Sequence, residues 1–145
     1  MFKRQVLLEC ISALLIMLFL YASLSKFLDF QTFTGEMNNQ PLPNSWTPFL
    51  VWIIPCSEIL ICIFVLLERT RLLGFWISFS FMTAFSVYSI MILLNFFGRI
   101  PCSCGGVIKR LTWKQHVALN LFFVALSIGG IILQRKKQFK PITIT

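Results

Sequence analysis

The chain has 145 residues, of which 57% are hydrophobic and only 12% are charged, and its formal net charge is +8. This balance excludes an ordinary soluble domain, because so few charged side chains cannot cover so much apolar surface in water. The length suits a single domain whose apolar surface faces lipid. We therefore expect an all-α, polytopic membrane protein.

Four long apolar runs predict a bundle of four transmembrane helices. Each run approaches the ~20 residues with which a helix crosses a bilayer, and the runs cover residues 6–28, 48–67, 72–97 and 113–133. Strands are excluded, because no alternating pattern of ~10 residues appears and unpaired backbone groups in lipid are costly. Residues 1–145 then form one membrane domain with outer loops at 29–47 and 98–112 and a basic tail at 134–145.

Basic residues near the ends of the spans predict the orientation, because cytoplasmic segments carry an excess of lysine and arginine. Eight of them fall on the side of the termini: Lys3, Arg4, Arg69, Arg71, Arg135, Lys136, Lys137 and Lys140. Five fall on the opposite side: Lys26, Arg99, Lys109, Arg110 and Lys114. We therefore expect a bacterial inner-membrane protein with both termini in the cytoplasm and both longer loops on the oxidising, periplasmic side.

Each end of the chain has a second interpretation. The start, "MFKR" before an apolar run, is also typical of a secretory signal peptide, but the run to Leu24 is long for one. The basic segment "QRKKQFKPITIT" suits either a nucleic-acid arm or an anchor to anionic lipid, and its position directly after a helix favours the anchor. We expect membrane lipid and no nucleic acid as a partner.

Short patterns predict local structure at the outer ends of the spans. Phe30, Phe33 and Met37 share one face of a short helix, which we expect to lie in the headgroup region and to cap the bundle. Thr112, followed three residues later by Gln115, predicts a capping box at the start of the fourth span. Small residues in the third span predict close helix packing: Ser78, Ser80, Thr83, Ala84, Ser86 and Ser89.

The hexapeptide "PCSCGG", residues 101–106, is the strongest candidate for chemistry. Cys102 and Cys104 lie one residue apart in a compartment where thiols tend to pair. A disulfide between them closes a small, strained ring that is easily reduced, so it exchanges readily with other thiols. Gly105 and Gly106 leave room for a partner's sulfur. The flanking Arg99, Lys109 and Arg110 either favour the reactive thiolate or meet lipid headgroups.

Two other interpretations of this cysteine pair carry less weight. The first treats the cysteines as chance thiols in a loop, which fits poorly with an oxidising compartment. The second is a metal site, for which only His116 and Glu58 offer further ligands, without the paired spacing of zinc sites. We therefore expect a redox-active dithiol and no metal.

Polar residues within the spans are candidates for a second site. Glu58 lies ~15 Å along the second span, where a carboxyl group usually faces the bundle interior; a protonated acid bonded to a neighbouring helix is the alternative. His116 and Asn120 share a face of the fourth helix, and His116 is either a proton-transfer group or a satisfied interfacial histidine. Lys26 extends to water or pairs with Asp29 or Glu58, and we favour the extension to water.

The other three cysteines are expected to act as small hydrophobic residues. Cys56 and Cys62 point to different sides of the second span, so they cannot bridge each other. Cys10 lies near the cytoplasmic end of the first span. Cys56 lies in the outer half of the membrane, so exchange of electrons with the loop pair is its alternative role.

Several segments together resemble the MauE branch of the DoxX-like membrane proteins, in the form found in Bacteroidetes: "YASLSKFLDF", "PCSEIL", "ERTRLLGFW", "PCSCGG" and "LTWKQHVALNLFF". The likeness covers nearly the whole chain, and the order and spacing of the segments make it specific. It implies periplasmic redox work, since MauE is tied to maturation of the disulfide-rich small subunit of methylamine dehydrogenase and DoxX relatives to quinone-coupled sulfur oxidation. Carried over by position, it points to Lys26, Glu58, Cys102, Cys104 and His116.

The chain departs from that family in one place. MauE proper is expected to have an aromatic residue and a glycine after the second cysteine, where Gly105 and Gly106 stand here. This leaves a methylamine substrate in doubt, and the more general redox role stands.

Two functions follow as expectations. In the first, the protein is a thiol-disulfide oxidoreductase whose Cys102 and Cys104 trade electrons with a periplasmic thioredoxin-like or disulfide-bonded protein, assisted by Glu58 and His116. A quinone held near Lys26, Glu58, His116 and Asn120 is the candidate cofactor. In the second, the protein is a non-catalytic subunit or assembly factor in which a structural disulfide shapes the outer loop.

Overall fold

The computed structural model describes residues 2–99 and 111–139, and within these ranges the chain forms helices and no strand. The long helices are α1 (Phe2–Leu28), α3 (Thr47–Leu66), α4 (Arg71–Leu93) and α5 (Trp113–Gln138). All of them are long and apolar enough to cross a membrane, α3 together with the 3-10 turn η1 (Asn44–Trp46) that precedes it. The predicted all-α fold with four membrane spans is confirmed.

The helices differ from the predicted spans at their ends. The prediction carried the third span to residue 97, but α4 ends at Leu93, because Asn95 and Gly98 have φ angles of 54° and 71°. Left-handed residues of this kind stop helical hydrogen bonding. The prediction ended the fourth span at residue 133, but α5 continues to Gln138, since its last turns are rich in arginine and lysine, which favour helix and complement the helix dipole.

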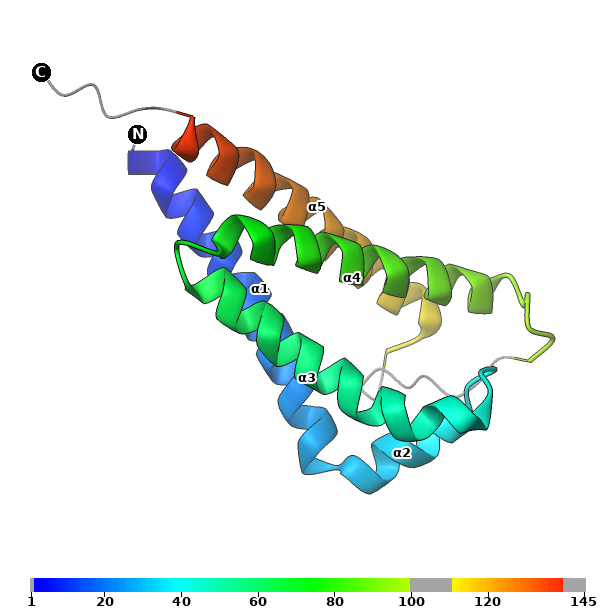
Figure 1. The fold of residues 1–145 in the computed structure, drawn as a ribbon. Coiled ribbons are helices and arrows are strands. Elements are labelled where there is room, and N and C mark those ends of the chain that lie inside the picture. Colours follow the sequence, from blue (N-terminus) through cyan, green and yellow to red (C-terminus); the bar gives the residue numbers. More distant parts are fainter. Residues whose placement is uncertain (1, 100–110, 140–145) are drawn as a thin grey trace, which may run out of the picture.

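The four long helices form two pairs that lie close together at one end of the molecule and diverge toward the other (Figure 1). α1 packs against α3 and α5, and α4 also packs against α3 and α5, so the helices make a ring. The start of α1 and the end of α5 lie at the end where the pairs meet, which we call the narrow end. The opposite, wide end carries α2 (Phe30–Asn38) and the residues that follow α4.

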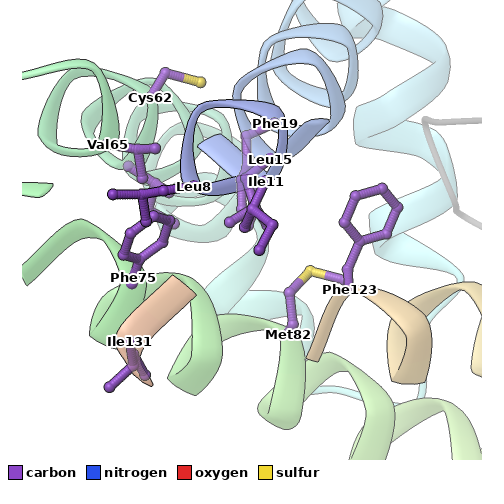
Figure 2. Close-up of a cluster of buried hydrophobic side chains, with 11 residues drawn as sticks. Leu8, Ile11, Leu15, Phe19, Cys62, Val65, Phe75, Met82, Phe123 and Ile131 are labelled. Carbon is purple, nitrogen blue, oxygen red and sulfur yellow. The ribbon is translucent and has the colours of Figure 1, made fainter. Parts of the chain in front are cut away.

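Close packing seals the narrow end. Apolar side chains from all four long helices form its core, among them Leu8 and Ile11 of α1, Val65 of α3, Phe75 of α4 and Ile131 of α5 (Figure 2). Two glycines permit this approach. A Cβ atom at Gly74 would lie 2.7 Å from the backbone nitrogen of Val65, and one at Gly130 would lie 2.8 Å from the Phe75 ring.

Buried polar groups also join the helices at the narrow end. The Arg71 side chain is buried, and its Nε donates to the Val65 carbonyl at 3.0 Å while its Nη1 lies 2.8 Å from Glu9 Oε1. This one residue therefore links the starts of α1 and α4 to the end of α3. Among the small residues predicted to pack, Ser78, Ser86 and Ser89 are buried and Thr83 is partly buried, whereas Ser80 and Ala84 are exposed.

The predicted short helix after the first span is confirmed as α2, but its apolar face has a different environment from the expected headgroup region. Phe33 and Met37 are buried against Val51 of α3. The expectation of a headgroup position is wrong for this face, because α3 offers it an apolar wall within the protein. The helix still covers the wide end of the bundle, as predicted for a cap.

Replacing Gly74 with alanine is expected to lower the free energy of unfolding by about 1–3 kcal/mol, because the added methyl group meets the backbone of Val65 rather than a movable side chain. Thermal unfolding of the purified protein in detergent measures the loss. Gly35→Ala is the matched control, since a Cβ at Gly35 meets nothing within 4 Å. Equal stability of the two variants would contradict the packing role of Gly74.

Candidate functional site

A cavity of about 270 Å³ lies at the wide end, where the helix pairs diverge. Its walls come from all five α-helices and are mostly apolar, including Phe19, Phe33, Leu50, Ile54, Phe81 and Phe85. A smaller number of polar side chains also line it: Lys26, Gln40, Glu58, Tyr88, Ser89, His116 and Asn120. An apolar concave site with a few polar groups is typical of a small-ligand site.

Lys26 and Glu58 form a buried ion pair in the wall of this cavity. Lys26 Nζ lies 2.7 Å from Glu58 Oε1, 3.3 Å from the Ala22 carbonyl oxygen and 5.8 Å from the centre of the Phe33 ring. The favoured prediction that Lys26 extends to water is wrong, and its alternative, pairing with Glu58, is correct. The reason is geometric: a helical side chain leans toward the start of its helix, and Phe33 of α2 covers the way out.

This ion pair fixes α1 against α3. Removing two charges from water is costly, so the contact is stable only while each charge has the other. The Ser23 hydroxyl strengthens the same contact by donating to the carbonyl oxygen of Pro55 at 3.2 Å. A shift of one helix past the other would therefore leave a buried charge unpaired.

Two buried polar atoms in the residues that line the cavity have no hydrogen-bond partner among the residues that the structure describes. They are Glu58 Oε2 from α3 and His116 Nε2 from α5. Glu58 and His116 are 3% and 8% exposed, so water does not reach them freely. Buried polar atoms nearly always have a partner, so the second carboxylate oxygen of Glu58 and the Nε2 atom of His116 are free to bind a ligand in this cavity.

The start of α5 places His116 in this wall. The predicted capping box is confirmed: the Gln115 backbone N–H donates to Thr112 Oγ1 at 3.5 Å, and the Thr112 N–H donates to Gln115 Oε1 at 2.9 Å. From this fixed start, Trp113, His116 and Asn120 follow at i, i+3 and i+7 and line the same cavity. His116 and Asn120 share one face of α5, as their spacing predicts. Trp113 lies on the same face, and its place there was not predicted from the sequence.

Gln40 is a second residue that the sequence analysis missed. Its side chain is buried, its Oε1 accepts a hydrogen bond from the Tyr88 hydroxyl, and its backbone carbonyl accepts one from Arg99 Nη2 at 3.1 Å. It therefore joins the chain after α2 to α4 and to the residues beyond α4. No sequence pattern marks it, because it follows the end of a helix and belongs to no periodic face.

Cys102 and Cys104 lie outside the described residues, as do Gly105 and Gly106. The described residues on either side of them belong to the wide end: Arg99 bonds to Gln40, and Thr112 caps α5. Within residues 2–99 and 111–139, no group of histidine, cysteine, aspartate or glutamate side chains forms a metal site.

The three described cysteines lie apart from the cavity wall. Cys10 is exposed in α1. Cys62 is buried, with Sγ 3.6 Å from the Ile16 carbonyl oxygen. Cys56 is exposed and is not a cavity-lining residue. The opposite environments of Cys56 and Cys62 agree with the prediction that they point to different sides of the helix.

The sequence segment that forms the cavity belongs to a region that matches one protein family. Residues 4–133 match the family model described as methylamine utilisation protein MauE. The comparisons with curated proteins and with solved structures gave no match. Every residue that lines the cavity falls within the matched range.

Replacing Lys26 alone with methionine is expected to lower the free energy of unfolding by about 3–5 kcal/mol, because the Glu58 charge then remains buried without its partner. The double variant Lys26→Met/Glu58→Met removes both charges and is expected to be more stable than Lys26→Met. Denaturation of the purified variants in detergent measures both. A double variant with the summed loss of its two single variants would contradict the coupling.

Proposed function

Because the chain belongs to the MauE family of membrane proteins, we propose that it is a thiol-disulfide redox protein of the bacterial inner membrane. In this proposal Cys102 and Cys104 exchange electrons with a periplasmic thioredoxin-like or cysteine-containing protein. One observation carries the proposal: Arg99 and Thr112, which flank the dithiol segment, lie at the same end as the cavity that Glu58 and His116 line.

The exchange uses two successive attacks by sulfur. The Cys102 thiolate attacks one sulfur of the partner's disulfide, which breaks that bond and forms a mixed disulfide. The Cys104 thiolate then attacks Cys102, which closes the Cys102–Cys104 bond and releases the partner as a dithiol. The two sulfurs of this chain thereby lose the two electrons that the partner gains. The same steps in reverse oxidise the partner.

Buried polar residues of the cavity support the redox step by handling protons. Each thiol that becomes a thiolate releases a proton, and positioned histidine and carboxylate side chains are the groups that most often act as general bases. We assign this role to His116 and Glu58, and we assign to Lys26 the role of holding the Glu58 carboxylate in place. Arg99 adds a cation near the start of the dithiol segment, which favours the thiolate.

The charge distribution supports an orientation with the wide end in the periplasm. The start of α1 and the end of α5 both lie at the narrow end. The same end carries seven basic residues: Lys3, Arg4, Arg69, Arg71, Arg135, Lys136 and Lys137. Basic residues concentrate on the cytoplasmic side of a membrane, where they also bind anionic lipid. The dithiol segment then lies in the oxidising compartment, which its chemistry requires.

A second candidate function is a non-catalytic subunit or assembly factor for a periplasmic protein. The bond between Arg99 and the Gln40 carbonyl favours it, because that contact fixes the chain at the entry to the dithiol segment, as a docking loop of constant shape requires. In this case the disulfide is structural and no exchange occurs.

Replacing Cys104 with alanine is expected to trap a mixed disulfide between Cys102 and a periplasmic protein, because the second attack can no longer release it. Non-reducing gel electrophoresis of membranes from the native cells, followed by mass spectrometry of any adduct that reductant removes, detects it. Cys62→Ala is the matched control and is expected to give no adduct. Monomers alone in the Cys104→Ala sample would favour the assembly factor.

Labelling with a membrane-impermeant maleimide tests the orientation. In spheroplasts treated with reductant, Cys102 and Cys104 are expected to react, because they lie on the outer side. A variant without the five native cysteines that carries Lys136→Cys, at an exposed position at the narrow end, is expected to react only after the membrane is permeabilised. Reaction of this cysteine in intact spheroplasts would reverse the proposed orientation.

A further inference from the structure

The buried apolar side chains of the described residues form two separate clusters. The larger cluster joins all four long helices, and its members from α3 all follow Glu58. The smaller cluster packs Phe33 and Met37 of α2 against Val51 of α3, and its members from α3 all precede Pro55. α3 therefore takes part in two packing units, and the change from one unit to the other falls between Pro55 and Glu58.

The chain departs from regular helix where it enters the smaller unit and where it leaves it. Asp29, between α1 and α2, has φ −126° and ψ 55°, which lie outside the helical region. A single residue of this kind between two helices absorbs a rotation of one against the other. Pro55 lies inside α3 and has no N–H group, so the Val51 carbonyl loses its helical donor, and helices bend at such positions. Residues 30–54, which we call the lid, are therefore bounded by two hinges.

Polar contacts fix both hinges to the rest of the bundle. Lys26 lies three residues before Asp29. Glu58 lies three residues after Pro55, and its Oε1 is 2.7 Å from Lys26 Nζ. The Ser23 hydroxyl also donates to the Pro55 carbonyl oxygen at 3.2 Å. Breaking the ion pair would leave two charges unpaired in lipid, so these contacts stay in place when the lid moves.

Hydrogen bonds at Gln40 hold the lid against α4 and the residues after it. The Gln40 Oε1 accepts from the Tyr88 hydroxyl, and the Gln40 carbonyl accepts from Arg99 Nη2 at 3.1 Å. A hydrogen bond of this kind contributes much less than is lost when a buried ion pair breaks, because its groups bond to water instead. Gln40 is therefore the point at which the lid separates from the bundle.

The lid also forms one wall of the cavity. Six of the lining residues belong to it: Phe33, Met37, Gln40, Leu42, Leu50 and Ile54. The facing wall comes from α1, α4 and α5. Phe33 in addition lies over Lys26, whose Nζ is 5.8 Å from the centre of its ring. Movement of the lid therefore widens the cavity and uncovers the ion pair.

We propose that the lid turns about Asp29 and Pro55 and controls access to the cavity. The structure shows the closed form, in which α2 lies beside α3 at the wide end (Figure 1). In the open form the Gln40 hydrogen bonds are broken, and the ion pair between α1 and α3 is retained. A bend of about 20–30° at Pro55 moves the start of α3, about 12 Å away, by about 4–6 Å.

Distances between pairs of spin labels, measured by double electron–electron resonance on the full-length protein in detergent, test the lid. Cys62 is kept, because it is buried and takes no label. The other four cysteines are replaced with serine: Cys10, Cys56, Cys102 and Cys104.

Each pair has one label at Leu121→Cys, an exposed position of α5 outside the lid. The second label is at Asn38→Cys at the end of α2, at Phe49→Cys in α3, or at Leu60→Cys in α3. Phe49 and Leu60 are matched, since both are exposed on α3 and they lie on opposite sides of Pro55. Leu60→Cys is therefore the control for the other two positions.

The variant Tyr88→Phe/Arg99→Met removes the donors to Gln40 and keeps the ring of Tyr88. The distances from Asn38→Cys and Phe49→Cys to Leu121→Cys are then expected to lengthen by about 4–6 Å, while the distance from Leu60→Cys stays the same. Tyr88→Phe alone serves as the test if the double variant does not fold.

Pro55→Ala, added to the same variant, is expected to reduce the lengthening. Alanine restores an N–H donor to the Val51 carbonyl and keeps the carbonyl that Ser23 binds. An undiminished lengthening would overturn the hinge at Pro55.

The remaining outcomes also decide the inference. Unchanged distances in a folded Tyr88→Phe/Arg99→Met protein would overturn the lid. Lengthening from Asn38→Cys alone means that α2 moves without α3, and equal lengthening from Leu60→Cys means that α3 moves as a whole; either result would overturn the joint movement about Pro55. Cys102 and Cys104 are absent from every sample, so the inference stands or falls independently of thiol exchange.

Discussion

The buried ion pair between Lys26 and Glu58 is the contact on which the wide end of the molecule depends. Lipid offers no water to either charge, so each must find its partner inside the bundle. That requirement fixes α1 against α3 at one relative position, and the Ser23–Pro55 hydrogen bond reinforces it. It also requires a cover, which Phe33 of α2 provides. The ion pair thus explains why a short helix between two spans folds back onto the bundle.

The cavity is a consequence of unequal packing along the same helices. At the narrow end, Gly74 and Gly130 bring backbones and rings into close contact, and Arg71 ties the helix ends together. At the wide end, large aromatic side chains line the cavity between the helices. A bundle held firmly at one end can remain open at the other without losing its fold. Close packing and open space are therefore found at opposite ends of the bundle.

Much of this architecture follows from local sequence patterns, and the remainder depends on contacts between distant segments. The spans follow from hydropathy, the start of α5 from the Thr112 capping box, and the shared face of His116 and Asn120 from helical spacing. The partner of Lys26 was mispredicted, because a long side chain reaches water or Glu58 with similar ease until α2 is in place. The end of α4 was placed too late, because residues 94–97 remain largely apolar beyond the left-handed turn. No sequence pattern predicted the buried position of Gln40 or its contacts.

The contacts of Gln40 connect the two parts of the proposed site. Its backbone carbonyl binds Arg99, which leads into the dithiol segment, and its side chain binds Tyr88, which lines the cavity. A change at either part therefore acts on the same buried residue, and a buried amide tolerates little displacement because its polar atoms must keep partners. Gln40 is therefore a buried contact between the cavity wall and the chain that leads into the dithiol segment. Glu58 and His116 come from opposite helix pairs, so their shared cavity exists only in the assembled bundle, where Gln40 also binds Arg99.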